Sequence, residues 1–261
     1  RFGDTMVLAA VTVSPNVSTL PFFPLTVEYR EKTYAAGKIP GGFLKREGRP
    51  SDKEILAARG IDRSIRPLFP EGFKNEIQVF VTVISADQEN DADVLGVLAA
   101  STALAISPIP WDGPIAAVRV GQVEGNWILN PTFQQLEFST IDLFVTGSAD
   151  SIVMVEGGAL EISEKEVLDA LKIGQKGIKE LIGVAQKVIT KAAKPTMAWV
   201  KAERDAALTK RVEELAEKAM AKAINAKDKA GRSEGVAKVK ASVVEQLLAE
   251  FPDQGRTIGN E

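Results

Sequence analysis

Strand-like runs are confined to the first two-thirds of the chain, and this asymmetry constrains the fold more than any other feature. Most of the runs are rich in β-branched residues, which favour strands. They are Met6–Val13, Leu25–Arg30, Ile77–Ser85, Ile115–Val123, Trp127–Leu129, Ile141–Thr146 and Ile152–Glu156. Between residues 203 and 251, Ala, Lys, Glu and Leu dominate, with apolar residues at helical spacing. The chain is therefore predicted to form a layered domain of strands and helices followed by a small all-helical one.

Helix signals separate several of the strands. Ser51 and Ser163 each stand three residues before a glutamate, the capping-box pattern of a helix start. Pro67 is expected to stop the first of these helices, and Asp93 is expected to cap another over residues 93–106. Gly174 and Gly177 are expected to weaken the helix after Ser163. The segment Gly231–Gly235 is expected to break the helical tail into two or three helices. The order of elements indicates an α+β fold of β-α-β layers.

These patterns predict three regions. The first is a layered domain over residues 1–192, the second a helical domain over residues 193–252, and the third a linker over residues 253–261. Pro195 and Pro252 mark the boundaries of the helical domain. Because the first residues lead directly into a strand, we expect the chain to be a fragment truncated at its N-terminus.

Composition limits the chemistry. With 45% hydrophobic and 26% charged residues, the chain resembles an ordinary globular protein, and no apolar run approaches the roughly 20 residues of a membrane span. Cysteine and histidine are both absent, which excludes disulfides, Cys/His zinc sites and Ser-His-Asp triads. Carboxylates, Lys and Arg, hydroxyls or a carboxylate-bound metal would have to carry any chemistry. We expect an intracellular protein.

Positive charge is concentrated in one segment. Between Glu28 and Arg66 there are ten basic and six acidic residues, a net of +4, whereas the whole chain carries −3. The basic residues are Arg30, Lys32, Lys38, Lys45, Arg46, Arg49, Lys53, Arg59, Arg63 and Arg66. A local positive patch on an acidic chain is typical of an anion-binding site.

The glycine-flanked loop in this segment combines apolar and basic residues. Phe43 and Leu44 could form a platform on which a nucleobase stacks, while Lys45 and Arg46 hold the phosphate backbone. The alternative is that Phe43 fills a gap in the domain or in a subunit contact. The pattern alone leaves both interpretations open.

The helix after Ser51 carries three arginines. Arg59, Arg63 and Arg66 are spaced to project from one face, and their planar guanidinium groups suit bidentate phosphate binding. The alternative is a face paired with carboxylates, since Asp62 and Glu54 lie close by. No pair of carboxylates stands at a convincing metal-bridging spacing. Trp111 and Trp127 are interpreted as core or interface residues.

Several longer motifs resemble the polynucleotide phosphorylase family of phosphorolytic 3′→5′ exoribonucleases. The first group comprises Phe22-Phe23-Pro24-Leu25-Thr26-Val27-Glu28-Tyr29, Ala35-Ala36-Gly37-Lys38-Ile39-Pro40-Gly41-Gly42-Phe43 and Arg46-Glu47-Gly48-Arg49-Pro50-Ser51. The second comprises Ile61-Asp62-Arg63-Ser64-Ile65-Arg66-Pro67-Leu68-Phe69-Pro70, Ile109-Pro110-Trp111-Asp112-Gly113-Pro114 and Val153-Met154-Val155-Glu156-Gly157. The resemblance is dense over residues 3–190 and looser in the helical tail.

The resemblance implies a particular part of such an enzyme. It implies a first RNase PH-like domain, with the ribosomal protein S5 domain 2-like fold, joined to the all-helical domain. The second RNase PH-like domain, which carries the phosphate-binding serine and the Mg²⁺-binding aspartates, would be missing. At the positions of those aspartates this chain has Gln134 and Thr140. This half is therefore expected to hold no catalytic residue and no metal.

The resemblance also implies an RNA-binding role. The family loop of two aromatic residues and two arginines faces a central channel and grips RNA, and here it reads Phe43-Leu44-Lys45-Arg46. Leu44 therefore lacks a ring for stacking, and Lys45 cannot bind phosphate bidentately. The expected RNA-binding residues are Phe43, Leu44, Lys45, Arg46, Arg49, Arg59, Arg63 and Arg66.

The expected activity is degradation of single-stranded RNA with inorganic phosphate to nucleoside diphosphates, by a homotrimer in the bacterial cytoplasm or in an organelle. Degradosome-type protein partners remain open. One rival is a non-catalytic RNA-binding or scaffold subunit of an exosome-like ring, and another is a stand-alone RNase PH-type tRNA-processing enzyme. The helical tail disfavours both, because such relatives generally lack it.

Overall fold

The computed structural model describes residues 1–41, 46–201 and 205–252. It divides into two compact units, Arg1–Val200 and Lys201–Glu261. The first unit contains strands at all seven predicted positions, and the capping-box helices begin where the sequence predicts. The fold is the expected α+β class. Among the described residues, no helix is both long and apolar enough to cross a membrane.

The first sheet has three strands in the order β1-β3-β2. They are β1 (Met6–Val17), β2 (Leu25–Glu31) and β3 (Asn75–Ser85), with β1 antiparallel and β2 parallel to β3. Because β3 is central, its alternate residues Ile77, Val79, Val81 and Val83 are all fully buried on one face. Strand β2 is an edge strand, so its outer backbone groups have no partner strand in this sheet.

The second sheet has four antiparallel strands in the order β5-β4-β6-β7. They are β4 (Ala116–Val123), β5 (Asn126–Leu129), β6 (Ile141–Gly147) and β7 (Ile152–Ala159). A short helix, α3 (Phe133–Leu136), connects β5 to β6.

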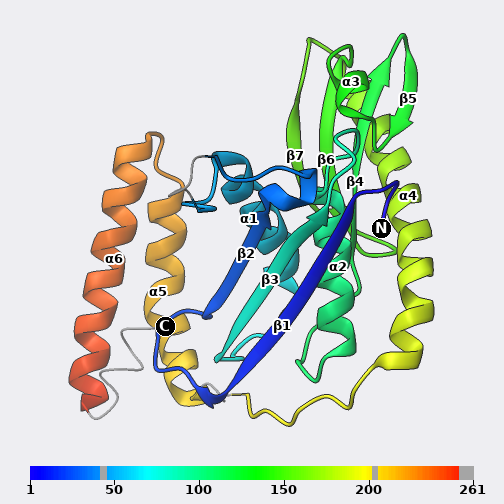
Figure 1. Cartoon of the computed structure of the whole chain (residues 1–261). Coiled ribbons are helices and arrows are strands. Elements are labelled where there is room, and N and C mark those ends of the chain that lie inside the picture. Colours follow the sequence, from blue (N-terminus) through cyan, green and yellow to red (C-terminus); the bar gives the residue numbers. More distant parts are fainter. Residues whose placement is uncertain (42–45, 202–204, 253–261) are drawn as a thin grey trace. The chain divides into compact units, whose positions relative to one another are not determined.

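Two helices lie between the sheets and a third covers the outer face of the second sheet (Figure 1). The inner pair is α1 (Asp52–Ile65) and α2 (Asp93–Ile106), and the outer helix is α4 (Glu164–Ala192). Short 3₁₀ turns, η1 (Thr33–Ala36) and η2 (Arg66–Leu68), follow β2 and α1; η2 contains the predicted helix stop, Pro67.

Strand alternation divides the second sheet between two cores. Val118 of β4 and Val145 of β6 pack toward α4, whereas Ala117 and Phe144 pack toward α1 and α2. Trp111 packs against the inner core and Trp127 against the outer one, which confirms their interpretation as core residues. The inward face of β4 and β6 is also the one that carries the charged residues described below.

Gly174 and Gly177 of α4 are contact points with the second sheet and do not interrupt the helix. A Cβ atom on Gly177 would lie 3.0 Å from Leu129 Cδ1, and one on Gly174 would lie 3.3 Å from Val120 Cγ2. The helix remains continuous through both positions. These glycines let α4 approach β4 and β5 closely.

The first unit extends beyond residue 192, where the sequence predicts its end. The backbone N–H groups of Lys194 and Met197 donate to the carbonyls of Ile106 (3.1 Å) and Pro108 (2.8 Å). The Trp199 ring lies edge-on to Phe73, with the centroids 5.8 Å apart. Residues 193–200 therefore pack on the first unit instead of opening the helical one.

The second unit is a pair of helices, α5 (Ala206–Ile224) and α6 (Lys229–Glu250). Leu208, Val243 and Leu247 form its small core, and Arg211 pairs with Glu250 across the two helices. The predicted break over Gly231–Gly235 is wrong, because α6 runs through both glycines. Asp228 caps α6 by accepting from Gly231 N, so the chain turns just before this segment.

Candidate nucleic-acid interface

Helix α1 is anchored at its first turn to the end of β2. Ser51 Oγ accepts from Glu54 N, and Glu54 Oε2 accepts from Ser51 N at 2.6 Å, which completes the predicted capping box. The other Glu54 oxygen accepts from Glu31 N at 2.9 Å. Burial raises the pKa of Glu54, but these N–H donors outweigh burial and hold it below its usual value. One carboxylate therefore fixes the position of α1 relative to the first sheet.

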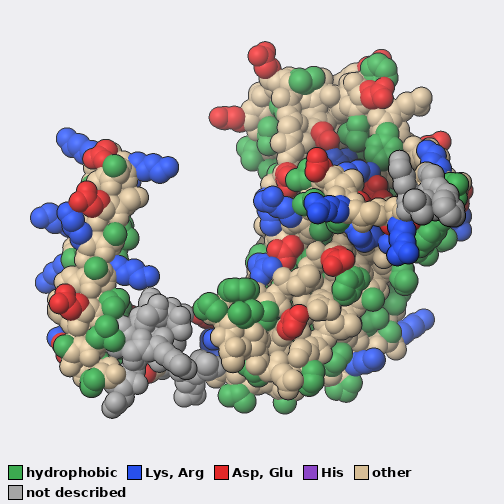
Figure 2. Space-filling model, turned by 60° about the vertical axis from the view of Figure 1, so that its left-hand side comes forward, with side chains coloured by type: hydrophobic (Ala, Val, Ile, Leu, Met, Phe, Trp, Pro, Cys, Tyr) green, Lys and Arg blue, Asp and Glu red, His purple; other side chains and the backbone are tan. Residues whose placement is uncertain are grey.

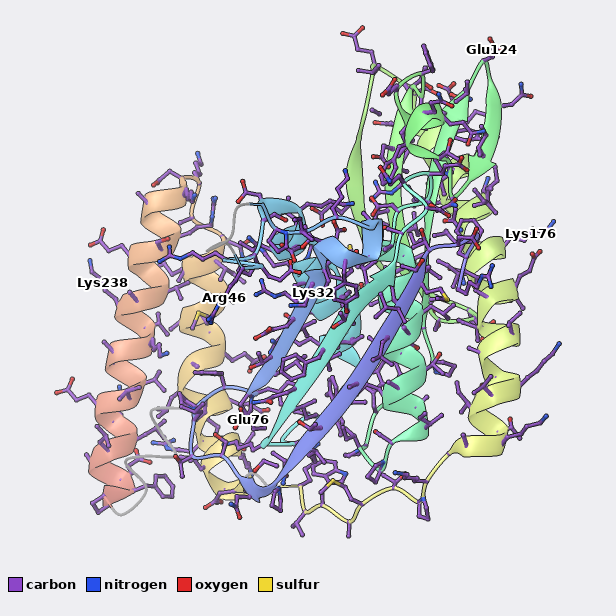
Figure 3. The ribbon with its side chains drawn as sticks, viewed as in Figure 1. Lys32, Arg46, Glu76, Glu124, Lys176 and Lys238 are labelled. Carbon is purple, nitrogen blue, oxygen red and sulfur yellow. The ribbon has the colours of Figure 1, made fainter. Side chains whose placement is uncertain are left out.

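The loop before α1 is also anchored where the structure describes it. The Glu47 carboxylate accepts from Thr33 N at 3.3 Å and from Thr33 Oγ1 at 2.8 Å, and Arg30 donates to Gly48 O at 3.4 Å. Phe43, Leu44 and Lys45 lie outside the described residues. Arg46, marked in Figure 3, and Arg49 are both exposed, and neither forms an ion pair with a described residue.

Arg63 of α1 and Arg66, which follows α1 as the first residue of η2, both donate to carboxylates. Arg66 donates to both oxygens of Asp62 (2.7 and 2.9 Å) and to the carbonyls of Phe23 and Leu25, each at 3.2 Å. Arg63 instead reaches across to β7 and donates to Glu156 at 2.6 Å. In helical projection, positions 59, 63 and 66 fall within about 60° of one another, so they share one face and differ in their partners. The alternative interpretation, pairing with carboxylates, therefore describes Arg63 and Arg66.

Arg59 is the exception on this helix. It is exposed, and no described residue forms an ion pair with it. It lines a groove of about 580 Å³ between α1 and the free edge of β2. The groove's other charged residues are Arg30, Arg66, Glu28, Glu54 and Asp62, so its walls are neutral overall. On the face of the first unit that Figure 2 shows, basic and acidic side chains are interspersed.

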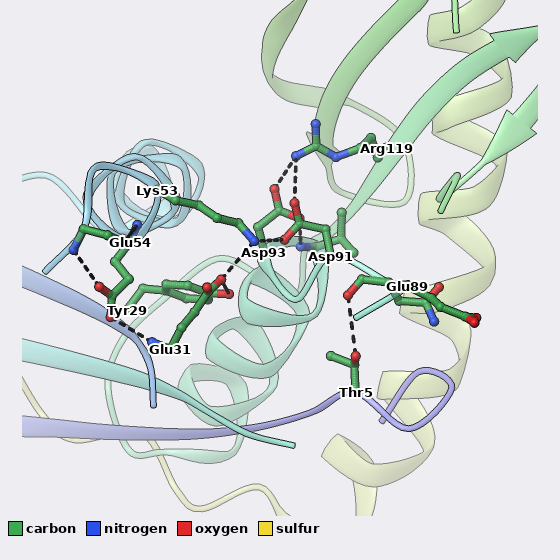
Figure 4. Close-up of polar contacts among 12 residues, drawn as sticks. Thr5, Tyr29, Glu31, Lys53, Glu54, Glu89, Asp91, Asp93 and Arg119 are labelled. Atoms are coloured by element: carbon green, nitrogen blue, oxygen red, sulfur yellow. Dashed lines mark hydrogen bonds and ion pairs between the residues drawn. The ribbon is translucent and has the colours of Figure 1, made fainter. Parts of the chain in front are cut away.

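A charged network lies between the sheets, and its centre is Arg119 on β4. Its guanidinium donates to Asp93 on α2 at 2.5 Å and to both oxygens of Asp142 on β6, at 2.7 and 2.8 Å. Asp91 lies 3.8 Å away, and the Arg119 side chain is only 16% exposed. Figure 4 shows Arg119 facing Asp91 and Asp93. Asp93 is therefore an ion-pair partner and the first residue of α2, while Ala92 occupies the capping position that the sequence assigned to Asp93.

Lys53 extends this network to α1 and β2. Its ammonium lies 3.2 Å from Asp91, 3.1 Å from Glu31 and 5.2 Å from the centre of the Phe133 ring. Glu31 in turn accepts from the hydroxyl of the buried Tyr29 at 3.0 Å. Figure 4 shows Lys53 reaching from α1 toward both carboxylates. The network thus connects α1, α2 and both sheets.

Burial and close charges set the protonation of this network. Burial, aided by the nearby Asp91, raises the pKa of Asp93 to about 6 despite the attraction of Arg119. Burial lowers the pKa of Lys53, but Asp91 and Glu31 outweigh it and raise the pKa above its ordinary value. Burial also lowers the pKa of Arg119, but the attraction of Asp93 and Asp142 outweighs burial and raises the pKa above its ordinary value. Both cations therefore stay charged.

The arrangement does not suit a magnesium ion. Gln134 is exposed, and Thr140 donates its hydroxyl hydrogen to the side-chain oxygen of Gln122 at 2.9 Å. An amide and a hydroxyl replace the carboxylates that Mg²⁺ prefers, and Asp142 is already bound by Arg119. Among the described residues, no group of three or more acidic side chains could hold a metal.

The sequence patterns did not identify Lys53, Asp91 and Arg119 as a connected set. One signal was available: Arg119 stands between Val118 and Val120 in an apolar strand, so period-two alternation places it on the opposite face from both. Its carboxylate partners come from a helix and a strand far along the chain. Only the packing of those elements identifies them.

Family models match almost all of this architecture. Two models of the 3′ exoribonuclease family match the first unit, domain 1 over residues 1–110 and domain 2 over residues 113–177. A third, described as "Polyribonucleotide nucleotidyltransferase, RNA binding domain", matches residues 207–260. The first unit thus has the RNase PH-like fold of 3′ exoribonucleases.

Curated relatives refine this assignment. The polyribonucleotide nucleotidyltransferase of Gemmatimonas aurantiaca is 65% identical over 260 residues, which covers 100% of this chain and 36% of the relative. The enzymes of the same name from Geobacillus kaustophilus and Bacillus cytotoxicus are 46% and 48% identical over 254 residues, covering 97% of this chain and 35% of each relative. The chain belongs to the polyribonucleotide nucleotidyltransferase family, and it spans about a third of the length of these relatives.

Proposed function

We propose that this chain is the RNA-guiding part of a phosphorolytic 3′→5′ exoribonuclease. In the complete protein, inorganic phosphate would attack the 3′-terminal phosphodiester and release a nucleoside diphosphate. One observation carries the proposal for this part: Arg46, Arg49 and Arg59 stand exposed without ion-pair partners among the described residues, whereas the inner carboxylates are paired with Arg119 and Lys53. These exposed guanidinium groups suit phosphate groups.

The partners of these side chains separate residues that would contact RNA from residues that would position α1. Arg46, Arg49 and Arg59 would hold the backbone of single-stranded RNA, with Phe43, Leu44 and Lys45 of the same segment contributing. Arg63 and Arg66 would serve indirectly, by fixing α1 against β7 and β2. Because the described residues do not fit Mg²⁺, we assign the metal and the phosphate site to the remaining part of the protein. We further propose a homotrimer that acts in mRNA degradation, in the bacterial cytoplasm or an organelle.

The first test measures binding of this chain to oligo(A) as a function of salt. Alanine substitution of Arg46, Arg49 and Arg59 together should weaken binding and reduce the slope of log K against log salt by roughly 0.7 for each lost phosphate contact. Lys187→Ala on α4, an exposed lysine far along the sequence, is the control and should leave the slope unchanged. An unchanged slope in the triple variant would contradict the assignment.

The second test concerns catalysis. This chain, incubated with poly(A), phosphate and Mg²⁺, should release no nucleoside diphosphate. Release would show that this part holds a working site. RNA binding by the complete protein without any phosphorolysis would instead favour a non-catalytic RNA-binding subunit.

A further inference from the structure

The cavities of the first unit differ in the charge of their walls. The groove beside Arg59 is neutral, and the cavity beside Arg119 has two basic and three acidic residues. A third cavity, of about 330 Å³, is lined by Lys32, Lys38 and Lys53 with Glu31 as its single acidic residue, a net of +2. In a chain of net charge −3, this is a concentration of positive charge inside a concave site. We call it the lysine pocket.

The turn η1 and the residue after β3 form one side of the lysine pocket. The turn η1 is attached to the end of β3, because Ala86 N donates to Ala35 O at 3.0 Å. Gly37 adopts the left-handed conformation (φ 66°), which reverses the chain so that Lys38 N donates back to Thr33 O at 3.1 Å. Lys32 and Lys38 therefore stand at the two ends of one short turn. Lys32 is marked in Figure 3, just after β2.

The three lysines are not equivalent. Lys53 is fixed by Glu31 and Asp91, as described above. Lys32 and Lys38 form no ion pair with any residue in the described ranges. Two other carboxylates of the neighbouring segments have their own partners: Glu47 accepts from Thr33, and Asp87 accepts from the N–H groups of Asn90 and Glu89. Two ammonium groups are thus available for an anion.

The rest of the wall suits a nucleoside. Phe133 provides an aromatic surface, Gln88 and Asn90 provide polar side chains, and Val83, Ala35 and Ala92 are apolar. An aromatic ring and side-chain amides are the groups that stack on a base and bond to its edge, while lysines bind phosphate. A volume of about 330 Å³ lies at the lower end of the range for small-molecule sites, roughly 300–1,000 Å³.

We propose that the lysine pocket binds a phosphorylated nucleoside, with Lys32 and Lys38 on the phosphate groups and Phe133 against the base. The ligand is either a free nucleotide or one unit of an RNA strand, which share this chemistry. The proposal deepens the proposed function by adding a site that Arg46, Arg49 and Arg59 do not form. It does not require that those arginines bind RNA.

The test uses the whole chain and isothermal titration with ADP, adenosine and inorganic phosphate. ADP should bind more tightly than either fragment. The Lys32→Ala/Lys38→Ala double variant should weaken ADP binding by about tenfold or more, since charged hydrogen bonds are lost. The control is Lys176→Ala/Lys187→Ala, which removes two exposed lysines of α4 and should leave binding unchanged. Phe133→Ala should weaken ADP binding but not phosphate binding.

The outcomes separate the two proposals. Equal ADP affinity in the wild-type chain and the Lys32→Ala/Lys38→Ala variant would overturn the lysine pocket, as would adenosine binding as tightly as ADP. If oligo(A) competes with ADP in the wild-type chain and this competition is lost in the Lys32→Ala/Lys38→Ala variant, the ligand is a unit of RNA. If ADP binding depends on the two lysines but oligo(A) does not compete with it, the ligand is a free nucleotide. Lysine-dependent ADP binding by a chain that does not bind oligo(A) would support the pocket while contradicting the RNA-guiding role.

Discussion

Arg119 on β4 donates two hydrogen bonds to the carboxylate of Asp142, its diagonal neighbour on β6, at 2.7 and 2.8 Å. Both residues lie on the inward face of the second sheet, where their neighbours Ala117 and Phe144 belong to the inner core. The same guanidinium also binds Asp93 on α2, so it joins the sheet to the helix that it packs against. The pair is the part of the charged network between the sheets that ties β4 to β6.

Replacing Arg119 with methionine should destabilise the first unit strongly. The change keeps an apolar stem but leaves the mostly buried Asp93, together with the partly exposed Asp142, without their cation. Removing one partner of a buried ion pair costs about 3–5 kcal/mol. Urea unfolding followed by circular dichroism would measure the loss. Lys172→Met, which removes an exposed ion pair with Asp169, is the control and should change stability by less than about 1 kcal/mol. Similar losses in the two variants would contradict the structural role of Arg119.

The raised pKa of Asp93 predicts a pH dependence. Its pKa is about 6 in the folded chain and about 3.9 when unfolded, so between these values the folded state holds the proton and the unfolded state does not. The stabilisation that comes from protonated Asp93 in the folded chain is therefore fully present below pH 4 and is lost as the pH rises to 6. Asp93→Asn removes this titration.

The measurement for Asp93 is the difference in unfolding free energy between the two chains at pH 4, 5, 6 and 7. Relative to Asp93→Asn, the wild-type chain should lose stability steadily from pH 4 to 6 and then level off. A difference that is constant with pH would show that Asp93 titrates normally.

The glycines of α4 give a prediction with an internal control. Gly177→Ala would press a methyl group against Leu129 at 3.0 Å, and overpacking of this kind costs about 1–3 kcal/mol. Gly183 lies on the same helix, and a methyl group there would meet no described atom within 4 Å, so Gly183→Ala should stabilise the helix by up to about 1 kcal/mol. Thermal unfolding should therefore shift in opposite directions. A gain in both variants would mean that α4 can move away from β5.

The local elements were predictable because their signals are local. β-branched runs specified the strands, and two serine capping boxes specified the starts of α1 and α4, since a cap depends only on residues three apart. The break expected at Gly231–Gly235 failed for a related reason. The intrinsic cost of glycine in a helix is only about 1 kcal/mol, and the Asp228 cap with packing against α5 overcomes it.

The sequence by itself determined the two-part architecture, the concentration of positive charge before and within α1, and the family. Only the tertiary structure decided which charges are available. Arg59, Arg63 and Arg66 are chemically identical in the sequence, yet their partners differ. Arg66 donates to Asp62 and to the Leu25 carbonyl of β2, and Arg63 donates to Glu156 of β7, whereas Arg59 has no ion-pair partner among the described residues. The reason is physical: an ion pair depends on the distance between two charges, and that distance is set by the packing of elements that are remote along the chain.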